Sequence, residues 1–345
     1  MTATTLTAQH AKVQIARMSR NSERDLAMWR RLLQTADGAT LFHTADFLSY
    51  HGDRFDEHHL GVFKGDQLIA MMPMALVPHD DGIMARSPYG ASYGGMITAG
   101  QMSYRTSCEV ADALCEYLSK SGVKSLQMTP SLIEYSIRGD ETLLFALMQR
   151  ELHSIRHDVT HLVPVAQTGI EESLSTRARR AMHRAEQCGV TIARRVPIAE
   201  IWPVIEMTHE KFGGTPTHTM SQLASLTQSL RHHIFADAAM QDGKPIAAVV
   251  YFVLNSHTWM TFYLATNPDY RDSQGLTLLL CDGLSQCARE GIRYLDLGTS
   301  SVDLMARDNL FQFKENFGTV ARFRTTYLLS MKEAMNPQRV SLEAE

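Results

Sequence analysis

Apolar and polar positions follow two alternating periods along the chain, one typical of helices and one typical of strands. Residues 22–36 place Leu26, Trp29, Leu32 and Leu33 at helical spacing, which predicts a helix with one buried face. The same reasoning predicts further elements in the first half, namely a short helix at 45–50, a hairpin that turns at 64–66, helices at 104–121 and 142–152, and strands at 123–128 and 157–165.

A similar succession restarts near residue 170. Its expected elements are helices at 171–187, 198–212 and 220–231, a hairpin with turns at Gly243 and at Asn255-Ser256, a helix at 275–290 and a strand at 292–298. In both halves the expected order of elements is helices, a hairpin, a helix and a strand. This shared order indicates an internal duplication of a mixed α+β unit. A chain of 345 residues is also long enough for two domains, which we expect at residues 1–168 and 169–345.

Composition narrows the class of protein only slightly. Hydrophobic residues make up 44% and charged residues 20%, as is ordinary for folded proteins, and the net charge of -4 means that nucleic-acid binding would need a local basic patch. The five cysteines are scattered without a CxxC pair, and four of the fifteen histidines form the adjacent pairs His58-His59 and His232-His233, so we expect neither disulfides nor a bound metal. No apolar run approaches the ~20 residues that span a bilayer, and we expect a cytoplasmic protein without a membrane partner.

Residues 294–318, YLDLGTSSVDLMARDNLFQFKENFG, are the most informative stretch for function. An apolar strand ends at Asp296 and Gly298, where a glycine lets the backbone approach a ligand closely, and Thr299 and Ser300 follow with hydroxyl groups. This pattern predicts a binding site for an anionic or carbonyl group at the end of a buried strand. Asp296 itself is a general base, a hydrogen-bond acceptor for an ammonium group, or a cap of the strand end.

Lys314 lies near the end of the same stretch, after a polar loop. It is either a solvated lysine on that loop or a clamp for an anion in the site. Phe313 and Phe317 flank it and favour partial burial, and a buried ammonium needs an anionic partner. We therefore expect Lys314 to act in catalysis and Phe313 to contact the substrate.

Two further residues of the second half are candidates for proton transfer. Tyr263 lies in a strand expected to face the site, as part of the core or as a pocket wall with a hydroxyl that donates a proton. His218 either takes a proton from an attacking amine or lies exposed in a linker, with Thr217 or Thr219 capping the next helix.

Two other segments are candidates for substrate binding. Tyr89 and Tyr93 lie in a glycine-rich turn, where they either stack on a ring or sugar of the acceptor or belong to a structured loop that covers the core. Arg177, Arg180 and Arg184 share one helix face at i, i+3 and i+7, where guanidinium groups bind phosphate or are simply solvated.

The second half also resembles a known superfamily. Residues 262–298, FYLATNPDYRDSQGLTLLLCDGLSQCAREGIRYLDLG, resemble the central segment of the GNAT fold, a strand, a phosphate-binding turn, a helix and a strand. When FQFKENFG at 311–318 and LSTRARRAMHRAEQCGVTI at 174–192 are considered with this segment, the chain resembles the Fem-type branch of the GNAT superfamily. This resemblance implies two tandem GNAT-like domains, each a mixed, mainly antiparallel sheet flanked by helices, and aminoacyl-tRNA-dependent peptidyltransferase or related acyltransferase activity.

One departure from the GNAT pattern bears on the acyl donor. GNAT acetyltransferases bind the coenzyme A pyrophosphate with a [Q/R]xxGx[G/A] turn, whose free N–H groups point at the phosphates. Here the run is Arg271-Asp272-Ser273-Gln274-Gly275-Leu276, with one glycine out of register and a carboxylate near the expected phosphates. This argues against coenzyme A and leaves the turn as a helix cap.

These observations lead to an expected reaction. The sequence identifies no Ser, Cys or Thr as a nucleophile, either through a GxSxG nucleophile elbow or through a histidine partner. We therefore expect direct attack of an amine on the acyl carbonyl. The resemblance implies an amide-forming transferase with aminoacyl-tRNA as co-substrate, a small amine-bearing acceptor and no bound cofactor. The alternatives are an N-acyltransferase that uses acyl-CoA or an acyl-carrier protein, and a GNAT pair that binds a ligand without catalysis. The oligomeric state stays open.

Overall fold

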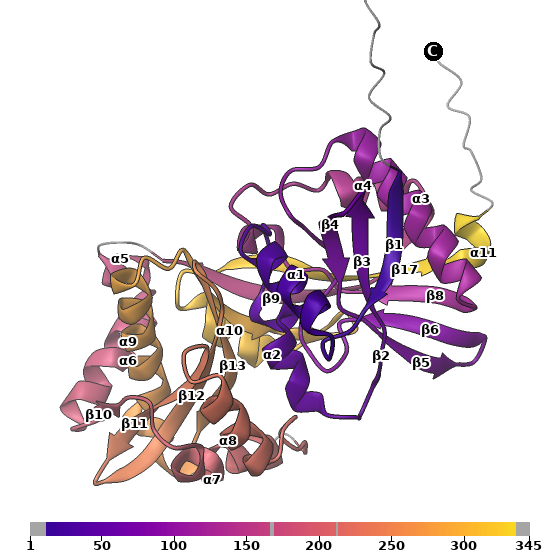
Figure 1. Ribbon diagram of the computed structural model, residues 1–345. Coiled ribbons are helices and arrows are strands. Elements are labelled where there is room, and N and C mark those ends of the chain that lie inside the picture. The colour runs from indigo at the N-terminus through magenta and orange to yellow at the C-terminus, as the bar shows by residue number, and fades with distance from the viewer. Residues whose placement is uncertain (1–11, 166–168, 212, 336–345) are drawn as a thin grey trace, which may run out of the picture. The chain divides into compact units, whose positions relative to one another are not determined.

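The computed structural model describes residues 12–165, 169–211 and 213–335, which form two compact units (Figure 1). Unit 1 comprises residues 12–38, 51–155 and 326–335, and unit 2 comprises residues 39–50 and 156–325. The units are thus interleaved along the chain, in contrast to the single boundary near residue 168 that the repeat suggested.

Unit 1 contains two sheets with helices packed on them. One sheet has the strand order β1-β3-β4-β7, and the other has the order β17-β8-β6-β5-β2. The elements of unit 1 are β1 (Val13–Met18), α1 (Glu23–Leu33), β2 (Asp56–Glu57), β3 (His59–Lys64), β4 (Gln67–Met72), β5 (Ala75–His79), β6 (Gly82–Ser87), β7 (Ile97–Thr98), α3 (Tyr104–Lys120), β8 (Val123–Met128), the 3-10 turn η3 (Ile133–Tyr135), α4 (Thr142–Met148) and α11 (Met331–Ala334).

Unit 2 is built on one large sheet with the order β10-β11-β12-β13-β14-β9-β17. Two long strands, β9 (Leu152–Pro164) and β17 (Val320–Ser330), begin in one unit and end in the other. The other elements are η1 (Leu41–His43), α2 (Ala45–Leu48), α5 (Ile170–Ser173), α6 (Thr176–Gln187), β10 (Thr191–Ala193), α7 (Ile198–Glu210), α8 (Met220–Ser229), β11 (Ile234–Gln241), β12 (Lys244–Asn255), β13 (Thr258–Thr266), η4 (Pro268–Ser273), α9 (Gly275–Arg289), β14 (Tyr294–Thr299), the hairpin β15 (Ser301–Val302) and β16 (Met305–Ala306), and α10 (Asp308–Glu315); η2 (Ser49–His51) follows α2.

Most elements form where the local pattern predicts them. Helix α1 begins after Ser22, whose side chain accepts a hydrogen bond from the Asp25 amide, and it buries Trp29 and Leu32 as its spacing requires. The hairpin of β3 and β4 turns at Gly65, which adopts a positive φ of 62°. Helices α3 and α9 and strands β8 and β14 likewise lie within about a residue or two of their expected bounds.

Three segments differ from the expectations. The helix expected at 142–152 ends at Met148, because β9 begins at Leu152. The helix expected at 171–187 is divided into α5 and α6, because the Ser175 side chain caps a new helix. Residues 308–315 form helix α10, so Lys314 lies in the last turn of a helix and not on a loop.

The core of unit 2 lies on both faces of its sheet. Helices α6 and α9 pack against each other and against one face, which includes Tyr251 and Trp259 (Figure 1). On the other face, Phe42 and Phe47 contact Phe252 with ring centroids 6.2 and 6.4 Å apart. The short segment 39–50 therefore belongs to unit 2 although it lies early in the sequence.

The two units repeat one motif, a strand, a helix and a parallel strand. In unit 1 this motif is β6-α3-β8, and in unit 2 it is β13-α9-β14. Strands β6 and β8 stay paired along their length, from Ile83 with Val123 to Ser87 with Met128. Strands β13 and β14 pair over three residues only. The structure thus supports the duplication and shows that the parallel strands separate in unit 2 alone.

Candidate functional site

The separation of β13 and β14 marks the candidate site. The last parallel pair joins Met260 and Asp296, after which neither strand pairs with the other. Just beyond this pair, Phe262 is an extra residue in the pairing of β13 with β12, a β-bulge that redirects β13. Bulges are common beside active sites, because they redirect side chains that a regular strand would place elsewhere. Beyond the pair of Met260 and Asp296, β13 and β14 border a stretch without mutual pairing, which we call the opening.

Asp296 is fully buried at the edge of this opening. Its Oδ1 accepts hydrogen bonds from Thr160 Oγ1 and from the Gly298 amide, both at 2.7 Å. Its backbone carbonyl also accepts a hydrogen bond from Thr261 Oγ1 at 3.3 Å. These contacts are those of a strand-end cap, one of the three roles that the sequence left open.

Lys314 reaches the same strand end from helix α10. Its Nζ donates hydrogen bonds to the carbonyls of Gly298 at 2.7 Å and Thr299 at 2.8 Å, and the side chain is 2% exposed. Gly298 has a φ of +78°, a left-handed conformation that suits glycine, and this turns its carbonyl toward the lysine. The partners of Lys314 are thus two backbone carbonyls, and its role as an anion clamp stays a prediction.

Burial decides the protonation of Lys314. Desolvation lowers the pKa of its amino group to about 7, although the Asp296 carboxylate opposes this shift. A neutral amine has two N–H groups, enough for both carbonyls. Near neutral pH the proton on Lys314 therefore costs little to remove.

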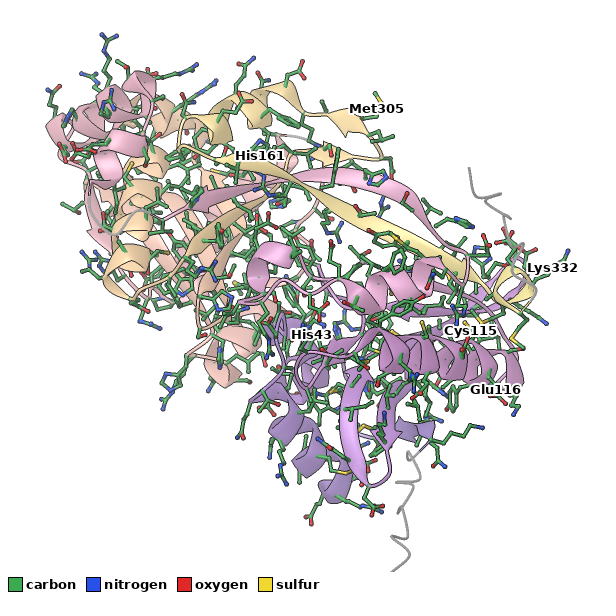
Figure 2. All side chains as sticks on the ribbon, turned by 90° about the horizontal axis from the view of Figure 1, so that it is seen from above. His43, Cys115, Glu116, His161, Met305 and Lys332 are labelled. Carbon is green, nitrogen blue, oxygen red and sulfur yellow. The ribbon has the colours of Figure 1, made fainter. Side chains whose placement is uncertain are left out.

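His161 joins this group, although the sequence analysis did not single it out. It lies on β9 and is 1% exposed, and its Nδ1 is 3.0 Å from Ser300 Oγ (Figure 2). Its ring meets Phe311 of α10 edge to face, with centroids 4.9 Å apart. Burial, and then the charge of Lys314, lower the pKa of His161 to about 4, so the ring is neutral. Ser300, which seemed to have no histidine partner in the sequence, has one in the structure.

The signal that could have revealed His161 is weak. Residues 157–165, HDVTHLVPV, place polar residues on a strand that is otherwise apolar. Two of them, Thr160 and His161, contact the strand-end site, and Asp158 accepts a hydrogen bond from Ser301 at 3.2 Å. Pairing those positions with Ser300 needs contacts across about 140 residues, which periodicity alone does not supply.

The second group of candidates lies on β13 and just before α8. The Tyr263 hydroxyl is 3.1 Å from the His218 amide, which donates to it, and 3.0 Å from His218 Nδ1. Burial raises the pKa of Tyr263, and donors from His218 and Thr217 oppose the shift. His218 is buried, so the expectation of an exposed linker histidine is wrong, whereas Thr219 does cap helix α8.

The remaining substrate-binding candidates are placed as follows. Thr299 is half-buried and pairs with Thr160 of β9. Phe313 is half-buried on α10, with its ring 5.3 Å from that of Phe317. In unit 1, Tyr89 and Tyr93 are buried in its core. The Tyr89 hydroxyl donates to Glu57 at 3.1 Å, and the environment of both rings is that of a structured loop.

The three arginines of helix α6 are exposed on its surface. Arg177, Arg180 and Arg184 make no side-chain hydrogen bond or ion pair with any residue that the structure describes. The neighbouring Arg179 behaves differently, because its guanidinium donates to the carbonyls of Glu171 and Leu174. The face of three arginines is therefore available to an anionic partner.

The turn before helix α9 is not a glycine-rich phosphate cradle. It forms the 3-10 helix η4, and Gln274, with φ of 54°, precedes α9 while its side chain donates back to the Arg271 carbonyl at 3.1 Å. Gly275 leaves room for Ile246 and Ala239, so its role is close packing of the helix on the sheet. Gln274 precedes α9 without a side-chain capping hydrogen bond, and its carbonyl accepts the Leu278 amide, so the turn starts the helix through its backbone.

The described residues also bear on metal binding and on membrane crossing. Within residues 12–165, 169–211 and 213–335, no group of three or more His, Cys, Asp or Glu side chains is arranged to hold a metal ion. In the same part of the chain, none of the helices combines the length and apolar character needed to cross a membrane.

Comparison with known proteins finds a family match for part of unit 2 and solved structures of similar fold. Residues 173–314 match the acetyltransferase (GNAT) domain family, a span that lies within unit 2 and ends at Lys314. No curated protein matches the sequence.

Three solved structures resemble nearly the whole chain. FemX superposes with a TM-score of 0.69 and 11% identity, over 93% of this chain and 98% of FemX. The C-terminal domain of a putative lysylphosphatidylglycerol synthetase from Agrobacterium fabrum has a TM-score of 0.55 and 13% identity, over 90% and 93%. A tandem GNAT protein from the clavulanic acid biosynthesis pathway has a TM-score of 0.53 and 13% identity, over 93% and 99%. The expected α+β fold with tandem GNAT-like domains is confirmed.

Proposed function

We propose that this chain, an acyltransferase of the Fem-like branch of the GNAT superfamily, forms an amide by moving an aminoacyl group from aminoacyl-tRNA to an amine. The acceptor is a small molecule or a peptide that carries the amine. The observation that carries the proposal is that unit 2 combines two features. One is the strand end where β13 and β14 separate, and the other is a face of α6 with three arginines that make no ion pair with the described residues.

The opening supplies the place of reaction. An extended acyl ester laid between β13 and the end of β14 brings its carbonyl beside Gly298 and Lys314. The amine attacks the carbonyl carbon, its proton leaves to a nearby base, and the ester C–O bond then breaks to release the tRNA hydroxyl. Tyr263 and His218 form a hydrogen-bonded pair that is suited to carry this proton. Positioning and electrostatics provide most of the rate enhancement.

The arginine face supports a phosphate-rich donor. Arg177, Arg180 and Arg184 lie at i, i+3 and i+7 with free guanidinium groups, and arginine binds phosphate with two parallel hydrogen bonds. Counterion release makes such binding fall steeply with salt, by roughly 0.7–0.9 units of log K per unit of log salt for each phosphate.

The turn before α9 argues against coenzyme A as donor. A pyrophosphate needs several free N–H groups at a helix N-terminus. Here the 3-10 helix η4 replaces the glycine-rich run, and Asp272 is exposed in that turn. A carboxylate close to phosphate oxygens opposes their binding.

The first test removes the proposed donor. Products formed from a native extract by the purified protein are analysed by mass spectrometry with charged tRNA, without it, and after complete digestion with RNase. We expect amide products only with intact charged tRNA. Products that persist after complete removal of RNA would exclude the tRNA donor and favour the thioester donor.

A second test addresses the arginine face. Replacing Arg177, Arg180 and Arg184 by Gln should weaken tRNA binding and make its salt dependence shallower by about 2–3 units of log K per unit of log salt. Arg289→Gln, at an exposed arginine of α9, is the matched control and should keep the original slope. An unchanged slope in the triple variant would place the tRNA elsewhere.

One observation favours a second candidate, an N-acyltransferase that uses acyl-CoA. The tandem GNAT protein from the clavulanic acid pathway, which shares the fold, is described as a structure without AcCoA. Addition of acetyl-CoA to the RNA-free protein and extract distinguishes this candidate, because it alone predicts acetylated products under those conditions.

A further inference from the structure

His161 carries a ring nitrogen that has no hydrogen-bond partner among the described residues. The His161 ring makes one hydrogen bond among the described residues, from Nδ1 to Ser300 Oγ at 3.0 Å. Its Nε2 makes none, and this nitrogen is not one of the fully enclosed side-chain atoms, so it keeps access to solvent although the residue as a whole is 1% exposed. A ring nitrogen that stays accessible on an otherwise buried residue beside a candidate site can meet a group of a bound ligand.

The environment of Ser300 determines which nitrogen of His161 holds the proton. Ser300 is fully buried, and His161 Nδ1 is the only described group that its hydroxyl contacts. If Nδ1 carried the hydrogen, the buried Ser300 hydroxyl hydrogen would have no acceptor among the described groups. If Ser300 donates to Nδ1, that hydroxyl is satisfied and the accessible Nε2–H group is left to meet solvent or a ligand. The second arrangement loses fewer hydrogen bonds, so the neutral ring carries its proton on Nε2.

The surroundings relate this N–H group to the strand end. Ser300 directly follows β14, its carbonyl accepts the Arg307 amide at 2.9 Å, and α10 begins there. Phe311 of the same helix packs against the His161 ring, and Lys314 lies one turn further on. The ring is thus fixed on three sides, by β9, Ser300 and α10. A donor that is fixed before the substrate arrives stabilises developing charge without reorganisation.

We propose that His161 Nε2–H donates a hydrogen bond to the carbonyl oxygen of the acyl group during transfer. This inference rests on the proposed function. When the amine nitrogen bonds to the carbonyl carbon, the C=O π electrons move to oxygen, and His161 stabilises that oxyanion without giving up its proton. The electrons return to the C=O bond as the C–O bond to the tRNA oxygen breaks. The proton of the amine ends on this tRNA oxygen, which leaves as a hydroxyl group. Ser300 is a positioning residue, because it acts only through the tautomer of His161.

Two variants of His161 separate donation from packing. His161→Asn keeps an acceptor for Ser300 near the place of Nδ1 and removes the donor at Nε2. His161→Gln can place an amide N–H near the place of Nε2. Loss of one oxyanion donor typically lowers kcat by about 10²–10³-fold. We expect that loss for His161→Asn with little change in KM, and recovery of most of kcat in His161→Gln.

The tautomer provides a readout that does not depend on activity. Nitrogen-15 NMR of histidine-labelled protein at neutral pH should show the proton of His161 on Nε2, and Ser300→Ala should produce a mixture of tautomers. His153→Asn, at an exposed histidine of unit 1, is the control and should change neither kcat nor the His161 signals.

The outcomes separate this inference from the proposed function. A proton on Nδ1, or a His161→Asn enzyme with wild-type kcat, would overturn the inference while acyl transfer itself stands. If the wild-type protein transfers no acyl group from any donor, the proposed function fails, and the assignment of the oxyanion fails with it even if NMR finds Nε2–H.

Discussion

At the scale of single residues, the strand-end site combines ionisable groups that burial keeps close to neutral. The low pKa of Lys314 and that of His161 both follow from removal from water, and each group has found hydrogen-bond partners that suit its neutral form. A site of this kind binds polar uncharged groups, such as an ester carbonyl, without the cost of burying an additional ion.

The pKa of Lys314 predicts a pH dependence of stability. Burial lowers it from 10.5 to about 7 in the folded protein, whereas the unfolded chain keeps the ordinary value. Between about pH 7 and about pH 10 the unfolded state therefore binds more protons, and the free energy of unfolding should rise with pH, by at most about 1.4 kcal/mol per pH unit from this group.

Chemical denaturation of the wild type and of Lys314→Met across this range measures the effect. Methionine has similar length and no proton to lose, so its curve should lack the rise, and the difference between the two proteins should grow from neutral to alkaline pH. Parallel curves would mean that Lys314 keeps its proton in the fold, in which case its role as an ammonium clamp would gain support.

The sequence allowed some of these residues to be predicted and not others. Lys314 drew attention because Phe313 and Phe317 flank it, and its burial follows from that local pattern. The same local reasoning missed that His218 is buried, because Tyr263, its partner, lies on a strand 45 positions away. His161 and Ser300 are 139 positions apart, and nothing in either segment predicts their contact.

At the scale of elements, the difference between β6-β8 and β13-β14 is the basis for placing the candidate site in unit 2. The same strand-helix-strand motif is closed in unit 1 and open in unit 2, and a β-bulge and a glycine with positive φ lie at the opening. Local patterns predicted the helices and hairpins of both motifs. They did not predict the separation, because pairing between strands is a tertiary contact that the pattern within one segment does not report.

The opening depends on the backbone of Gly298, and this can be tested by substitution. Gly298→Ala should cost about 1–2 kcal/mol of stability, because alanine disfavours the φ of +78°, while its Cβ would meet Thr261 O and Lys314 Nζ at ordinary distances of 3.8 and 3.9 Å. A shift of the strand end should also lower kcat for acyl transfer.

Gly291→Ala is the matched control for this prediction. Gly291 has a similar φ of +71° and no atom within 4 Å of its added Cβ, and it lies between α9 and β14, at the opposite end of β14 from the site. It should lose similar stability and keep wild-type kcat. Equal losses of kcat in the two variants would show that general destabilisation, and not the shape of the strand end, accounts for the effect.

At the scale of the whole chain, the two units exchange segments. Strand β17 pairs with β8 of unit 1 although most of the residues before it belong to unit 2, and residues 39–50 pack on β12 although their neighbours in sequence belong to unit 1. The sequence repeat indicated two similar domains and a single division between them. Periodicity within a segment does not report which distant sheet the segment joins, so it could not predict this exchange of segments.

This exchange predicts where a core substitution in the first 50 residues takes effect. Phe47 is 1% exposed and contacts Phe252 of β12, so Phe47→Ala should destabilise unit 2 by about 3–5 kcal/mol. Leu32 lies only 15 positions earlier but is buried in α1 of unit 1, which packs on β4, so Leu32→Ala should destabilise unit 1 by about 2–5 kcal/mol.

Hydrogen exchange resolves the two cases along the chain. In Phe47→Ala, amides of β12 and α7 should exchange faster, and those of β3 and β4 should stay protected; in Leu32→Ala the pattern should be reversed. Faster exchange of β3 and β4 in both variants would mean that residues 39–50 unfold with unit 1, as one domain ending near residue 168 requires. Because unit 2 contains the opening, Phe47→Ala should also lose acyl transfer at temperatures where Leu32→Ala still retains it.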